Sequence, residues 1–225
     1  MKEPTHCYLC EQPLPREPNR DHVIPEQLFD SANKPTALFT LPTCSTCNSG
    51  ISQDEEYFRV CLLSQAYGQT EATNLWNGPV FRSLQRREGR FRKMLANNIS
   101  PVAVSVPLYT NTGAYVGDGS VLRFSVPRVR RVLEKIVRGL YWKHTGTLIG
   151  NVRFDIYHFD PAVRYAPEAT LPHLRKLAQT FESGGKVLNY SFAIDQHEPR
   201  GSVWWLQFYG KPLFMILTDI RDAVS

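Results

Sequence analysis

The chain has 225 residues, of which 42% are hydrophobic, 12% aromatic and 21% charged, and this composition excludes a disordered or collagen-like protein and permits a substantial core. No segment is apolar over the length of a bilayer, and the N-terminus lacks the apolar stretch of a signal peptide, so we expect a cytoplasmic protein with no membrane partner. The net charge of +5 suits a polyanionic partner, but charge alone does not distinguish DNA, RNA, a membrane surface and coincidence.

Four of the five cysteines form two C-x-x-C pairs, Cys7 with Cys10 and Cys44 with Cys47. A gap of two residues lets both thiolates of a pair bind one ion, and in a reducing compartment such pairs favour a metal over disulfides. We therefore predict a structural zinc, closed by four thiolates, that stabilises a segment poor in core residues. The alternative is a set of unconnected core cysteines. Cys61 lies in an apolar run and is predicted to be a buried hydrophobic residue.

The segment between the cysteine pairs is rich in Pro, Asn and Thr, and a helical pattern begins only after the second pair. Ser52 and Glu55 match the S-x-x-E capping box, and Tyr57, Phe58 and Cys61 follow at helical spacing. The pattern predicts a helix that begins near Gln53.

A second helix is predicted over residues 80–97, where basic side chains crowd together. Arginine binds phosphate in a bidentate manner, so we expect this surface to contact a nucleic-acid backbone, although a charged helix is more often only a solvated face. The candidate nucleic-acid-binding residues are Arg82, Arg86, Arg87, Arg90, Arg92 and Lys93. Strands are predicted over 102–109 and 121–126, around a turn-rich segment.

An amphipathic helix is predicted over residues 128–142, with its basic side chains, Lys135 among them, mostly off the apolar stripe. Strands are predicted over 151–159, 187–195, 202–210 and 213–220, with a helix over 171–182 between the first two. The C-terminal part is therefore expected to be α+β with a largely antiparallel sheet.

The segment Asp21-His22-Val23-Ile24-Pro25 lies between the cysteine pairs, and Asn48 follows the second pair directly. Phosphodiester hydrolysis needs a base that deprotonates water and a divalent ion that polarises the phosphoryl group. An imidazole such as that of His22 titrates near neutral pH, and the oxygens of Asp21 and Asn48 suit a hard ion such as Mg²⁺ or Mn²⁺. Adjacent residues on a strand point to opposite faces, so Asp21 and His22 share one site only if the strand is twisted or bulged there.

The order C-x-x-C, D-H-V-I-P, C-x-x-C-N resembles the HNH endonucleases of the zinc-clamped type. The resemblance covers roughly the first sixty residues. It implies a ββα-metal unit over residues 1–60, in which zinc clamps the ends of a hairpin, with His22 as the general base and Asp21 and Asn48 as holders of the catalytic ion. The rest of the chain, residues 61–225, is expected from its predicted elements and basic residues to form a basic α+β domain that grips substrate or docks a partner.

The sequence departs from the family pattern at two positions. The middle Asn is missing from the segment ALFTLPT, where only Thr40 and Thr43 have polar side chains. The last His is also missing, and Asp54, Glu55 or Glu56 could replace it as a metal ligand, Glu55 being our candidate.

These features lead us to expect an HNH endonuclease that cleaves DNA with one divalent ion and a histidine base, as a component of a restriction or anti-phage system. The alternatives are a non-catalytic zinc-knuckle module that binds nucleic acid or protein, and an RNA-cleaving toxin. The C-terminal domain is expected to hold a protein partner or a second copy of the chain, an expectation that rests on analogy alone.

Overall fold

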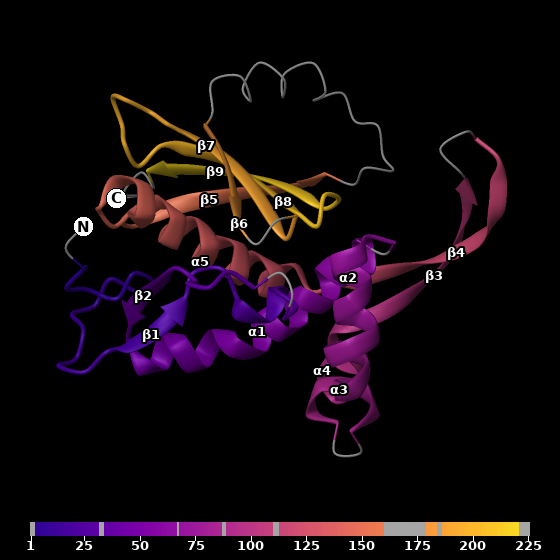
Figure 1. Ribbon diagram of the computed structural model, residues 1–225. Coiled ribbons are helices and arrows are strands. Elements are labelled where there is room, and N and C mark those ends of the chain that lie inside the picture. The colour runs from indigo at the N-terminus through magenta and orange to yellow at the C-terminus, as the bar shows by residue number, and fades with distance from the viewer. Residues whose placement is uncertain are drawn as a thin grey trace.

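The computed structural model describes residues 3–31, 34–66, 68–86, 89–109, 113–159, 179–183 and 186–220. These residues form a mixed α/β fold in which helix α5 (Val126–Thr145) lies between helix α1 (Ser45–Gln65) and an antiparallel sheet (Figure 1). The sheet has five strands in the order β5-β9-β8-β7-β6. A short hairpin of β1 and β2 lies beside α1.

The hairpin pairs β1 (Asn19–His22) with β2 (Thr40–Thr43) in an antiparallel register. The single-turn helix η1 (Glu26–Leu28) lies in the connection between the two strands, and α1 begins directly after β2. Two short strands are thus followed by a helix, which places the cysteine pairs before β1 and at the start of α1. Assignment of this arrangement to the ββα-metal class stays a proposal.

Helix α1 begins at Ser45, so the prediction of a helix start near Gln53 is wrong. Cys44 is the N-cap in extended conformation, and the first helical bond runs from the N–H of Asn48 to the carbonyl of Cys44. Ser52 lies inside the helix, where its hydroxyl donates to the carbonyl of Ser49. The capping-box pattern failed because both of its residues occupy helix interior, where no N–H groups need capping.

The region after α1 contains shorter elements than predicted. The helix predicted over 80–97 is divided, because Arg86 adopts an extended backbone after α3 (φ −64°, ψ 123°). The elements are α2 (Thr70–Leu75), a π-helical turn η2 (Trp76–Val80), α3 (Phe81–Gln85) and α4 (Arg90–Asn98). A two-stranded ribbon of β3 (Ile99–Tyr109) and β4 (Tyr115–Phe124) then extends away from the rest of the fold (Figure 1).

Helix α5 confirms the amphipathic pattern read from the sequence, and it ends at Gly146, which adopts the left-handed conformation (φ 72°) typical of a helix C-terminus. The four predicted C-terminal strands are also confirmed, and β6 is an additional strand. The strands are β5 (Val152–Phe159), β6 (Gln179–Ser183), β7 (Leu188–Ile194), β8 (Ser202–Phe208) and β9 (Leu213–Ile220).

The helix predicted over 171–182 lies partly outside the described residues, which leave out 171–178. Residues 179–182 are in β6, so the prediction is wrong there. Their strand conformation comes from pairing with β7, where Phe181 lies opposite Tyr190. Such pairing joins separate segments and is not visible in local periodicity.

One hydrophobic core joins the N-terminal segment to the rest of the chain. Val23 from the hairpin region, Phe58 from α1, Ile136 from α5 and Trp204 from the sheet belong to the same buried cluster. The division between residues 1–60 and 61–225 would fall inside α1, and it stays a prediction. Within the described ranges, no helix is long and apolar enough to cross a membrane.

The hairpin is held against α5 by a close contact that only glycine permits. A Cβ on Gly139 would lie 2.4 Å from Cγ1 of the fully buried Val23, the residue after His22. We expect Gly139→Ala to lower the free energy of unfolding by about 1–3 kcal/mol, because the added methyl group overpacks the core.

Gly50 of α1 provides the matched control. It is exposed, and an added Cβ would meet nothing within 4 Å, so Gly50→Ala should raise the free energy of unfolding by about 1 kcal/mol through helix propensity. Urea unfolding of both variants measures the two effects. Equal stabilisation by both substitutions would contradict the close contact at Gly139.

Candidate functional site

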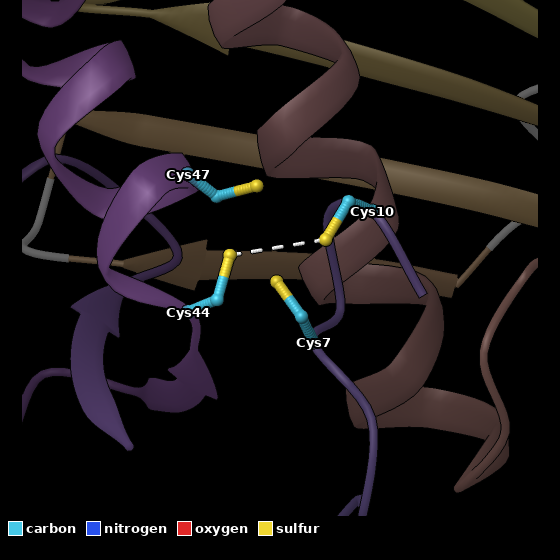
Figure 2. A group of neighbouring side chains, drawn as sticks. All are labelled: Cys7, Cys10, Cys44 and Cys47. Atoms are coloured by element: carbon cyan, nitrogen blue, oxygen red, sulfur yellow. Dashed lines mark hydrogen bonds between the residues drawn. The ribbon is translucent and has the colours of Figure 1, made fainter. Parts of the chain in front are cut away.

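The four paired cysteines come together in one cluster (Figure 2). Cys7 and Cys10 lie in the turn before β1, whereas Cys44 and Cys47 lie at the start of α1. All four Sγ atoms are within 4.8 Å of one another, and those of Cys10 and Cys44 are 3.8 Å apart. Zinc–sulfur bonds of about 2.3 Å in a tetrahedron place the sulfurs about 3.8 Å apart, whereas a disulfide needs about 2.05 Å. The cluster therefore fits one zinc ion.

The environment of the cluster favours thiolate at its most buried position. Burial alone would raise the pKa of Cys7, but hydrogen bonds with the Thr43 hydroxyl and with nearby backbone groups lower it to about 6. Burial and the neighbouring sulfurs of Cys44 and Cys10 raise the pKa of Cys47. Four adjacent thiolates repel one another, and a bound dication is what allows all of them to ionise together.

Beside this cluster, an open cavity of about 900 Å³ contains the other residues singled out in the sequence. Asp21, His22, Asn48 and Glu55 all line it, so the structure brings the four candidates together. Its walls come from β1, the segment around η1, one face of α1, and the α2–η2 region through Leu75 and Pro79.

The early start of α1 explains how that helix contributes to the cavity. Asn48, Ser52, Glu55 or Glu56, and Arg59 follow one another at steps of three and four residues, and all of them line the cavity. Residues at this spacing share one face of a helix. Asn48 therefore stands in the first turn of a continuous cavity-facing stripe.

Asp21 is a buried carboxylate that is held on both oxygens. Lys135 Nζ donates to Oδ1 over 2.7 Å, and the Tyr8 hydroxyl donates to Oδ2. The same ammonium donates to the Glu55 carboxylate, so it lies between two carboxylates from different elements. Burial raises the pKa of Glu55, and the nearby Lys135 partly offsets that rise.

The position of Lys135 corrects one expectation. It was expected off the apolar stripe of α5, but its side chain is fully buried. Its ammonium lies between the carboxylates of Asp21 and Glu55, and the role of Glu55 as a metal ligand stays a prediction. Among the residues that the structure describes, the four cysteines are the only group of three or more metal-binding side chains whose ligand atoms converge.

Removal of the Lys135 ammonium is expected to destabilise the protein strongly. Lys135→Met leaves two buried carboxylates without their cation, which typically costs about 3–5 kcal/mol at pH 7. The loss should shrink at acidic pH, because burial raises the pKa of Glu55 and its protonation removes one of the uncompensated charges. Urea unfolding at pH 7 and at acidic pH measures this.

The exposed Lys34 provides a control, because its ion pair with Glu26 is solvated. Lys34→Met should change the free energy of unfolding by less than about 1 kcal/mol. Equal losses in the two variants would show that the buried network does not depend on Lys135.

His22 is the last residue of β1, so its side chain shares the cavity with that of its neighbour Asp21 although strand neighbours normally point apart. The imidazole is 39% exposed, and its Nδ1 lies 3.6 Å from Oε2 of Glu26. This separation is too long for a hydrogen bond, so Glu26 acts on the imidazole only through its charge. Sequence reasoning did not identify Tyr8, Lys135 or Glu26 as neighbours of the site.

The predicted basic surface is present in part. Arg82, Arg86, Arg92 and Lys93 are exposed, and none of them forms an ion pair with another described residue. Arg87 lies outside the described residues, and for Arg90 only the backbone, at the start of α4, is described. In the chain this segment follows Pro79 of the cavity wall, and its exposed basic residues lie on α3 and α4 and at Arg86 between them.

Comparison of the chain with protein-family models, with curated proteins and with solved structures gives no match. The resemblance to HNH endonucleases therefore rests on the cysteine pairs, the D-H-V-I-P segment and Asn48.

Proposed function

We propose that the protein is a zinc-stabilised endonuclease of the HNH type that hydrolyses phosphodiester bonds of DNA with a divalent metal ion. The observation that carries the proposal is that Asp21, His22 and Asn48 line one cavity beside the four-cysteine cluster. The cluster serves as a frame: it ties the turn before β1 to the start of α1, the two places from which the cavity residues extend.

In the proposed reaction His22 is the general base. Its Nε2 accepts a proton from water as the water oxygen bonds to phosphorus, and the ester oxygen on the opposite side leaves and is protonated by solvent. The Glu26 carboxylate lies 3.6 Å from Nδ1, the ring nitrogen that does not take part in the proposed proton transfer.

The residues available for a divalent ion are Asp21 and Asn48, whose oxygens suit Mg²⁺ or Mn²⁺. Lys135 and Tyr8 each occupy one lone pair of the Asp21 carboxylate, and a further lone pair remains on each oxygen. A bound ion would polarise the phosphoryl oxygen and stabilise the leaving alkoxide. Lys135 fixes the orientation of the Asp21 carboxylate for that task.

The exposed arginines of α3 and α4 support a nucleic acid as substrate, because cationic surfaces bind phosphate backbones with release of counterions. By analogy with stand-alone HNH proteins, we place the enzyme in a restriction or anti-phage system.

Digestion of plasmid DNA and of RNA at matched salt, with Mg²⁺, with Mn²⁺ or without added divalent ion, tests the proposal. We expect DNA cleavage only when a divalent ion is present. Cleavage of RNA alone would assign a different substrate, and no cleavage of either under any condition would leave a non-catalytic zinc module as the function.

A further inference from the structure

One charged side chain in the cavity wall, that of Arg59, has no role in the cysteine cluster or in the proposed reaction. Arg59 lies on the cavity-facing stripe of α1, and its side chain is only 9% exposed. An arginine buried to this extent normally forms close ion pairs. Arg138, for example, has a side chain that is 15% exposed, and it donates to Oε1 of Glu11 over 3.1 Å.

Arg59 lacks such compensation among the described residues. The nearest carboxylate oxygen, Oε1 of Glu56, is 3.9 Å from Nη2, which is too long for a hydrogen bond. Its Nε is buried and has no hydrogen-bond partner. Burial lowers the pKa of Arg59, but a guanidinium stays charged at any pH that proteins tolerate. The protein therefore retains a desolvated positive charge with unused donors at the wall of the cavity.

We propose that Arg59 binds a backbone phosphate of the nucleic-acid substrate, an inference that rests on the proposed nuclease function. A phosphate supplies the acceptors that the guanidinium lacks, in the bidentate geometry that arginine favours. Asn48 and Arg59 are separated by roughly 16 Å along the axis of α1. Arg59 therefore holds a phosphate several nucleotides along the backbone from the one beside Asn48, and it positions the strand rather than taking part in bond cleavage.

Binding measured without cleavage tests this assignment. A fluorescein-labelled DNA oligonucleotide is titrated into His22→Ala protein, and anisotropy gives the affinity with and without the added change Arg59→Met. We expect about ten- to hundredfold weaker binding, the usual effect of losing a charge-assisted hydrogen bond, and a salt-dependence slope lower by about one. The matched control is Arg153→Met, which removes an exposed arginine of β5, remote from the cavity lining, and should change affinity less than about threefold.

Stability distinguishes a binding role from a structural one. Methionine removes a buried, poorly paired charge, so Arg59→Met should unfold at the same urea concentration as the parent protein or at a higher one. A structural arginine would give easier unfolding. The second variant, Arg59→Lys, retains the charge but loses the guanidinium fork, and it should bind several-fold more weakly with unchanged zinc content.

Undiminished affinity in Arg59→Lys and in folded Arg59→Met, or no measurable binding by the His22→Ala parent, overturns the inference. The two proposals fail in different ways. Arginine-dependent binding by a protein whose wild type cleaves nothing would refute the nuclease and keep the phosphate site. Cleavage at a rate that Arg59→Met leaves unchanged would support the nuclease and refute the phosphate site.

Discussion

Cys10→Ser is expected to remove the bound zinc and to unfold the N-terminal segment. Cys10 is exposed, so exchange of sulfur for oxygen leaves the core unchanged and acts through metal binding alone. Four-thiolate zinc contributes roughly 10–16 kcal/mol in small zinc-dependent folds. The strands that it anchors here have only four residues each, too short to be stable as an isolated hairpin.

Metal analysis and thermal unfolding measure the effect. The wild type should hold one zinc per chain, and Cys10→Ser should hold much less and melt at a lower temperature. Cys61→Ala is the matched control, because Cys61 is buried in α1 outside the cluster and should lose packing energy but no zinc. Equal zinc content in the two variants, or none in the wild type, would contradict the structural role of the cluster.

The features that the sequence predicted well depend on local spacing. Within each C-x-x-C pair, a gap of two residues turns both thiols toward one point, and the two pairs together form the cluster. Helix α5 has the period of an amphipathic helix. The start of α1 is not predicted correctly because the capping pattern of Ser52 and Glu55 lies inside the helix, whereas the role of Cys44 as N-cap depends on the cluster.

The features that the sequence did not reveal depend on contacts between distant segments. Lys135 is separated by 114 residues from Asp21 and by 80 from Glu55, and no periodicity pairs them. A weak signal was present, because Val132, Lys135 and Gly139 share one helical face that the glycine marks as closely packed. The burial of Arg59 likewise depends on distant segments, because the cavity that it lines is formed by α1 together with β1, the η1 region, α2 and η2.

Loss of activity in His22→Ala is the second large effect. General-base catalysis typically contributes about 10²- to 10⁴-fold to the rate. Removal of the imidazole should therefore reduce divalent-dependent cleavage by at least about a hundredfold. Folding should be unaffected, because the side chain is 39% exposed and its 3.6 Å contact with Glu26 is at the surface.

The most direct measurement is the initial rate of plasmid cleavage by wild type, His22→Ala and His197→Ala, each with one zinc per chain. His197 is exposed and does not line the cavity, so its removal should leave the rate unchanged. We predict Mg²⁺- or Mn²⁺-dependent cleavage by the wild type and by His197→Ala, and a loss of at least about a hundredfold in His22→Ala. Cleavage by His22→Ala at the wild-type rate, or no cleavage by the wild type with any divalent ion, would contradict the assignment of this cavity as a nuclease site.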